Sequence, residues 1–132
     1  MGQLNEMRLA VDHIIVPSGS AGTHAGMAVG MAGVNGGIPI SGVNVSRPKD
    51  VQEEIVYKLS QELAEKLGVK SGIVREDIVC FDQYVGPGYS LPTDSMVEAV
   101  KLFARTEAVL LDPVYSGKAA AGLIDLVRKG HF

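Results

Sequence analysis

Short runs of consecutive apolar residues recur along the chain, and longer amphipathic or glycine-rich stretches separate them. The first run, residues 13–17, is rich in β-branched residues and shows no polar alternation. This pattern is typical of a strand buried on both faces of a parallel sheet. Similar runs predict further strands at residues 38–45, 78–81 and 108–112, the last of them ended by Pro113.

The clearest helix follows the second predicted strand. It begins at Pro48, because proline is favoured at the first helical position, and ends before Gly68, the expected C-cap. Apolar side chains at every fourth position predict its buried stripe: Val51, Ile55, Leu59, Leu63 and Leu67. Its charged side chains are interpreted as a solvated face: Lys49, Glu53, Glu54, Lys58, Glu62 and Lys66.

Weaker signals mark the other helices. Small apolar residues at 27–31 predict one, a capping box at Ser95 opens another that runs to about Arg105, and residues 117–129 form the last. Residues before Val11 resemble the end of a further helix. Strands that alternate with helices predict an α/β fold in a single domain, residues 1–132, with a three-layer parallel sheet of about four strands.

Composition narrows the class of protein. The chain has 12 Lys and Arg against 15 Asp and Glu, a formal net charge of -3, which argues against a nucleic-acid partner and a polybasic membrane anchor. No apolar run approaches the ~18 residues of a membrane-spanning helix. The single cysteine, Cys80, excludes an internal disulfide framework, fits a cytoplasmic location and is interpreted as an inert core residue.

Three unusual segments, residues 18–26, 86–92 and 113–118, follow predicted strands. Ligands of parallel sheets bind beyond the carboxyl ends of the strands, so we expect the three segments to meet at one site. The first is rich in glycine and hydroxyl residues and joins a strand to a helix, an arrangement that suits a phosphate. Its spacing matches neither the dinucleotide fingerprint nor a Walker A loop, and a plain strand-to-helix turn stays an alternative.

Several polar residues have both a chemical and a structural interpretation. Tyr89 and Tyr115 could act as acid or base, or pack against neighbouring loops. His24 could be a base, although a structural hydrogen-bond donor is the more common role. Asp94 and Asp112 suit helix caps better than catalysis. No spacing of His, Cys, Asp and Glu suggests a metal site.

Three motifs carry a resemblance to a known family: residues 18–26 (SGSAGTHAG), 87–92 (PGYSLP) and 111–118 (LDPVYSGK). They closely resemble the C-terminal part of the D-cysteine desulfhydrase and 1-aminocyclopropane-1-carboxylate deaminase family, among the fold type II pyridoxal-phosphate enzymes. The resemblance implies a piece of the large domain of that fold. It corresponds to well under half of the family's chain.

The resemblance also implies roles for individual residues. The loop that cradles the phosphate of pyridoxal phosphate matches Gly19, Ser20, Ala21, Gly22 and Thr23. Tyr89 and Tyr115 match two active-site tyrosines near an amino-acid substrate, and Ser116, also a candidate N-cap, matches the residue that faces the pyridine nitrogen. A serine there, rather than a glutamate, favours the desulfhydrases, which eliminate sulfide from D-cysteine to leave pyruvate and ammonia.

The lysine that anchors the cofactor in this family falls in an N-terminal part that we expect to be absent, and Lys118 does not occupy that position. We therefore expect a truncated chain that keeps the phosphate loop and is inactive alone. Two alternatives stay open: a stand-alone ligand-binding or protein-interaction module, and one half of a split enzyme completed by a separate N-terminal chain. A homodimer is expected, because apolar surface left uncovered would need a cover.

Overall fold

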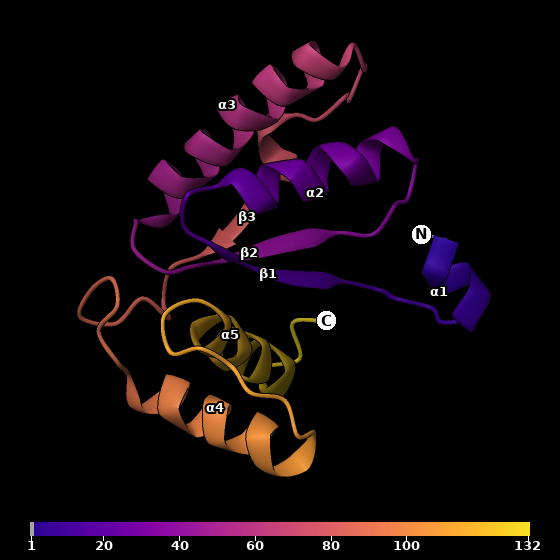
Figure 1. Cartoon of the computed structure of the whole chain (residues 1–132). Helices are drawn as coiled ribbons and strands as arrows, with labels where there is room; N and C mark the ends of the chain where they lie inside the picture. Colours follow the sequence, from indigo (N-terminus) through magenta and orange to yellow (C-terminus); the bar gives the residue numbers. More distant parts are fainter. Residues whose placement is uncertain (1) are drawn as a thin grey trace.

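The computed structural model describes residues 2–132 and shows a parallel sheet between two layers of helices (Figure 1). The three strands stand in the order β1 (Ile14–Ser18), β2 (Ile40–Asn44) and β3 (Val79–Phe81). Both pairings are parallel, and Ser18 at the end of β1 lies opposite Asn44 at the end of β2. The prediction of an α/β fold with a parallel sheet is confirmed.

Helices cover both faces of the sheet (Figure 1). On one face lie α2 (Gly22–Gly33) and α3 (Lys49–Leu67), which pack on each other and on the strands. On the other face α5 (Ser116–Arg128) contacts β1 and β2, and α4 (Asp94–Thr106) packs against α5. The remaining elements are the short α1 (Gly2–Met7) and a 3-10 turn, η1 (Arg75–Asp77). No helix within residues 2–132 combines the length and apolar character needed to cross a membrane.

Each layer has its own group of buried apolar side chains. Between the sheet and α2 and α3 lie Ala25, Val56 and Ile78. On the opposite face, Val43 of β2 packs against Ala119 of α5. Small residues allow α5 to approach the sheet closely, because a Cβ on Gly122 would lie 2.7 Å from Cγ2 of Val43.

The prediction of a fourth strand at residues 108–112 is wrong. These residues form an extended loop in which Ala108 has a left-handed φ of 55° and the side chain of Leu110 is 89% exposed. The loop ends at Asp112, whose carboxylate accepts hydrogen bonds from the first turn of α5. The sheet therefore has three strands within residues 2–132, because this apolar run leads into a helix cap and does not pair with a neighbour.

The buried face of α3 also differs from the expected one. Val51 and Leu67 are 48% and 60% exposed, and the fully or nearly buried residues lie beside the expected stripe: Gln52, Glu53, Val56, Ser60 and Ala64. Glu53 does not belong to the solvated face, because its Oε1 accepts the amide of Cys80 (2.9 Å) and its Oε2 pairs with Arg75 (3.0 Å). Two polar side chains of α3, Gln52 and Glu53, thus form hydrogen bonds with groups at β1 and β3.

The helix boundaries fall close to their predicted positions. The C-cap of α3 is Gly68, in the left-handed conformation with φ 66°, and Pro48 is the N-cap residue, one position before the helix. The capping box expected at Ser95 is wrong, because Thr93 caps α4 and its Oγ1 accepts the amide of Met96 at 3.2 Å.

Candidate functional site

The glycine-rich loop after β1 presents unused amide donors at the start of α2. Ala21, in the left-handed conformation (φ 74°), turns the chain into the helix, and the first helical hydrogen bond runs from Ala25 to the carbonyl of Ala21 at 2.9 Å. Among the hydrogen bonds of residues 2–132, none has an amide of residues 19–24 as its donor. Exposed hydroxyls of Ser20 and Thr23 flank them. The loop therefore fits an anionic group such as a phosphate.

Side chains from α3 and from the connection between β2 and α3 form hydrogen bonds with this loop. Gln52, completely buried, donates from Nε2 to Oγ of Ser18 (2.9 Å) and to the carbonyl of Gly19 (3.1 Å). Arg47 donates to the same carbonyl and to Oε1 of Gln52 (3.2 Å). The carbonyl of Gly19 is thus satisfied on the side of α3. Sequence reasoning missed both residues, because a polar residue beside the apolar stripe of a helix usually faces solvent.

A hollow beside the loop brings together predicted residues of all three segments. Its lining consists of Gly19, Ser20, Ser46, Arg47, Tyr89 and Tyr115. The hydroxyls of Tyr89 and Tyr115 lie 3.1 Å apart, and their rings meet edge to face with centroids 6.1 Å apart. The hydrogen bond with Tyr115 raises the pKa of Tyr89 above its ordinary value. The expected convergence of the first two segments with Tyr115 is present in the structure.

Gly19 is required for this arrangement. A Cβ at this position would lie 2.8 Å from Cε1 of Tyr115 and 3.0 Å from Cγ2 of Val45. Any side chain would therefore push the tyrosine ring away from the loop. This close approach gives a physical reason for one of the three glycines in the segment.

Ser116 does not line this hollow. Its hydroxyl donates to the carboxylate of Asp112 and accepts the amide of Asp112 at 2.8 Å. Asp112 also accepts the amides of Val114 (2.8 Å) and Tyr115 (2.7 Å). Burial opposes ionisation of Asp112, but these hydrogen bonds outweigh it and lower its pKa to about 2. Asp112 thus has the structural role that the sequence favoured, because its carboxylate accepts the amides that lead into α5. The N-cap residue itself is Tyr115, so the expectation that Ser116 is the N-cap is wrong: Ser116 is the first residue of the helix. A contact of Ser116 with a cofactor ring stays a prediction.

His24 has a structural environment. Its side chain is 1% exposed, its Nδ1 lies 3.3 Å from Oγ of Ser18, and burial lowers its pKa to about 4. The ring is therefore neutral near pH 7. Cys80 lies next to it and is completely buried, which raises the thiol pKa to about 12. Both residues fit the structural interpretation better than a catalytic one.

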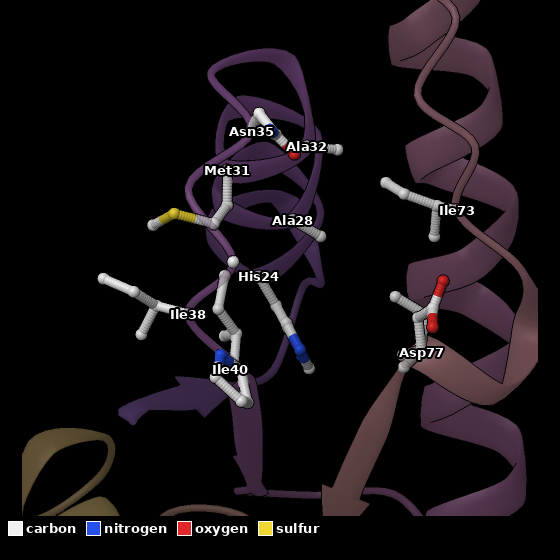
Figure 2. A pocket seen from close by; sticks show the side chains of 12 residues that line it. His24, Ala28, Met31, Ala32, Asn35, Ile38, Ile40, Ile73 and Asp77 are labelled. Carbon is white, nitrogen blue, oxygen red and sulfur yellow. The ribbon is translucent and has the colours of Figure 1, made fainter. Parts of the chain in front are cut away.

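A separate cavity of about 310 Å³ lies toward the amino end of β2. Figure 2 shows the ring of His24 pointing into the space between Ile40 and Asp77, below Ala28 and Met31 of α2. None of the predicted cofactor-binding residues lines this cavity. Within residues 2–132, no group of three or more His, Cys, Asp and Glu side chains could hold a metal ion.

Comparisons with known proteins show which proteins the chain resembles. A family described as "Pyridoxal-phosphate dependent enzyme" matches residues 2–132. D-cysteine desulfhydrases of Salmonella newport (strain SL254) and Salmonella agona (strain SL483) are each 44% identical to the chain over 132 residues, which is 100% of this chain and 39% of theirs. A crystal structure of an ACC deaminase homologue matches with a TM-score of 0.81 at 36% identity, over 98% of this chain and 39% of that chain. The chain thus spans 39% of the length of these relatives.

Proposed function

Because this chain belongs to the family of pyridoxal-phosphate dependent enzymes, we propose that the loop after β1 binds the phosphate group of pyridoxal phosphate. The fold is that of the fold type II enzymes of this family. The observation that carries the proposal is the row of unused amide donors at residues 19–24, at the start of a helix. Such a helix start stabilises a dianionic phosphate through its amides and its dipole.

Each residue of the loop has a definite part in this site. The amides of Gly19, Ser20, Ala21, Gly22 and Thr23 would donate to phosphate oxygens, and the exposed hydroxyls of Ser20 and Thr23 would add two more donors. Arg47, which also lines the hollow, adds positive charge nearby. When bound, pyridoxal phosphate supplies an electron sink for the bonds around the α-carbon of an amino acid.

We propose that the whole enzyme is a D-cysteine desulfhydrase-like lyase, which converts D-cysteine and water to pyruvate, ammonia and sulfide. Support comes from the 44% identity to D-cysteine desulfhydrases. Tyr89 and Tyr115 would be its catalytic residues on this chain. The hydroxyl of Tyr89 is protonated at neutral pH, because its pKa lies above the ordinary value of 10, so it has a proton to donate to the departing sulfur.

We propose further that residues 1–132 by themselves hold the phosphate group without a covalent bond to the cofactor, and are inactive alone. No lysine of residues 2–132 lines the hollow beside the phosphate loop. The ammonium of Lys118, which lies nearest in sequence to Tyr115, donates to the carbonyls of Val85 and Gly88. Its nitrogen is therefore not free for the aldehyde of the cofactor.

Titration with inorganic phosphate, followed by amide chemical shifts, tests the site. We expect the amides of residues 19–23 to move and saturate, and Ser20→Glu to abolish the movement by placing a carboxylate at the loop. Ser95→Glu is the matched control, because Ser95 is an exposed serine near the start of another helix. Amides that stay fixed in the native chain would contradict the proposal.

A second titration with pyridoxal phosphate separates the cofactor from anions in general. Tighter binding of pyridoxal phosphate than of inorganic phosphate is expected, because the ring adds contacts in the hollow. Borohydride reduction should leave no stoichiometric pyridoxyl-lysine in peptide mass maps. Equal affinities for the two anions would favour a general anion-binding module, and one fully modified lysine would overturn the non-covalent assignment.

A further inference from the structure

Lys118 is the largest fully buried side chain within residues 2–132 and is 0% exposed. It lies in the first turn of α5, and its Nζ donates to the backbone carbonyls of Val85 (2.7 Å) and Gly88 (2.9 Å). It forms no ion pair with any carboxylate of the described residues. Burying an ammonium without a carboxylate is costly, so the stability of the fold alone does not account for a lysine here.

The two carbonyls belong to a segment without regular structure. Residues 85–93 contain no helix or strand, and two of them have left-handed backbones, Gly86 (φ 69°) and Ser90 (φ 64°). The backbone bonds of the segment are local, from Val85 to Asp82 (3.2 Å) and from Leu91 to Gly88 (3.3 Å). The ammonium of Lys118 therefore supplies the long-range hydrogen bonds that tie these carbonyls to α5.

This segment carries Tyr89, and α5 begins directly after Tyr115. The backbone of Tyr115 is fixed by the carboxylate of Asp112 at 2.7 Å. Lys118 thus connects the two segments whose tyrosine hydroxyls lie 3.1 Å apart. A primary ammonium suits this position, because its three N–H groups can reach two carbonyls that converge on one point.

We propose that Lys118 is a positioning residue, which holds the Tyr89 hydroxyl against that of Tyr115 and so fixes the wall of the hollow opposite the phosphate loop. The role of this wall in facing an amino-acid substrate rests on the proposed function. The positioning itself rests only on the buried lysine, the two carbonyls and the tyrosine pair.

Lys118→Met tests the proposal, because it removes the three donors and keeps a long apolar side chain. In the native chain we expect nuclear Overhauser cross-peaks between the rings of Tyr89 and Tyr115. In Lys118→Met we expect these cross-peaks to be lost and the amides of residues 85–91 to exchange faster with solvent. Lys101→Met, at an exposed position on α4, should preserve both signals. Cross-peaks that persist in Lys118→Met overturn the positioning role.

A measurement on the native chain covers the case in which Lys118→Met does not fold. The ammonium protons of Lys118 should exchange slowly and show couplings through the hydrogen bonds to the carbonyl carbons of Val85 and Gly88. Exchange as fast as that of Lys101 overturns the proposal.

The phosphate titration separates this inference from the proposed function. In Lys118→Met the amides of residues 19–23 should still respond to phosphate, because the loop is held by Arg47 and Gln52. Loss of the tyrosine cross-peaks supports the positioning role even if the native chain ignores phosphate, a result that overturns the proposed function alone. A variant that folds but loses the phosphate response and keeps the cross-peaks overturns the positioning role.

Discussion

The hydroxyl of Ser18 lies 3.3 Å from Nδ1 of His24, and both side chains are 1% exposed. The same hydroxyl accepts a hydrogen bond from Nε2 of Gln52 at 2.9 Å. One oxygen at the end of β1 therefore connects the first turn of α2 with α3. The phosphate loop lies directly above this connection, so its shape depends on buried groups that no ligand touches.

The buried imidazole of His24 makes stability dependent on pH. Burial lowers its pKa to about 4, whereas a histidine in the unfolded chain titrates near its ordinary value of 6.5. The unfolded state binds more protons between these values, so stability is greatest above pH 6.5 and falls as the pH drops toward 4. We expect a loss of about 2 kcal/mol between pH 7 and pH 5. Urea unfolding measures it. His24→Gln should remove most of this pH dependence, whereas the exposed His131→Gln should retain most of it. A smaller part comes from His13, whose pKa is lowered by burial and by the charge of His131.

Replacing Gln52 should weaken both the fold and the loop. Gln52→Leu removes the donors to Oγ of Ser18 and to the carbonyl of Gly19, which then keep only His24 and Arg47 as partners, at a cost of about 1–3 kcal/mol. The phosphate-induced shifts at residues 19–23 should shrink as well. Gln61→Leu, at an exposed position on the same helix, is the control for denaturation and titration. Equal effects of the two substitutions would refute the role of Gln52.

Two glycines should respond to alanine in opposite directions. Gly122→Ala places a Cβ 2.7 Å from Cγ2 of Val43 and 3.1 Å from the ring of Tyr84, so we expect a loss of about 1–3 kcal/mol from overpacking. Gly30→Ala meets no atom within 4 Å and lies inside α2, so it should stabilise the chain by about 0.5–1 kcal/mol. Thermal unfolding of both variants measures the difference. A neutral Gly122→Ala would show that α5 can move away from the sheet without cost.

The cap at the start of α5 should depend on the charge of Asp112. Its pKa of about 2 lies below the ordinary 3.8, so its contribution to stability is present above pH 3.8 and is lost as the pH falls through 2. Asp112→Ala should cost about 1 kcal/mol and speed amide exchange at residues 114–116. Asp94→Ala should have a smaller effect, because Thr93 caps α4. The reverse order of effects would contradict this assignment.

We also expect the chain to form a two-fold dimer at micromolar concentration, as its apolar composition suggests. Several large apolar side chains of the single chain are exposed to solvent: Leu110 is 89% exposed and Val109 is 44% exposed. Sedimentation analysis measures the oligomeric state, and Leu110→Lys should shift it toward the monomer if this loop is covered in the dimer. A native chain that stays at 13.9 kDa would disprove self-association.

The sequence predicted the parts of this fold that depend on local patterns. The β-branched runs gave β1, β2 and β3, and the glycine after α3 marked its end, because burial on both faces and left-handed caps leave clear signals. The run at residues 108–112 has the same apolar character as a strand, but it ends in Asp112, whose carboxylate accepts amides at the start of α5, and it pairs with no strand of residues 2–132. Hydrophobic periodicity alone does not distinguish such a loop from a strand.

The sequence predicted those residues of the candidate site that a ligand would touch. It did not predict the buried residues that hold them in place. Glycines and hydroxyls mark the loop at residues 19–23, and Tyr89 meets Tyr115, as we expected of segments beyond the carboxyl ends of a parallel sheet. No sequence pattern indicates that Gln52 and Lys118 are buried, since a polar residue beside an apolar stripe usually faces solvent. Their roles depend on tertiary contacts with residues that lie far from them in the sequence.

The hollow beside the phosphate loop draws its lining from residues 19–20, 46–47, 89 and 115, which are spread over most of the chain. No fragment of the polypeptide contains it, and it exists only when the sheet and both helical layers have assembled. A ligand that binds there binds only the folded chain. By mass action it therefore shifts the equilibrium between the folded and unfolded states toward the folded state. At a hundredfold excess over its dissociation constant, such a ligand would add about 2.7 kcal/mol to the stability of the entire domain.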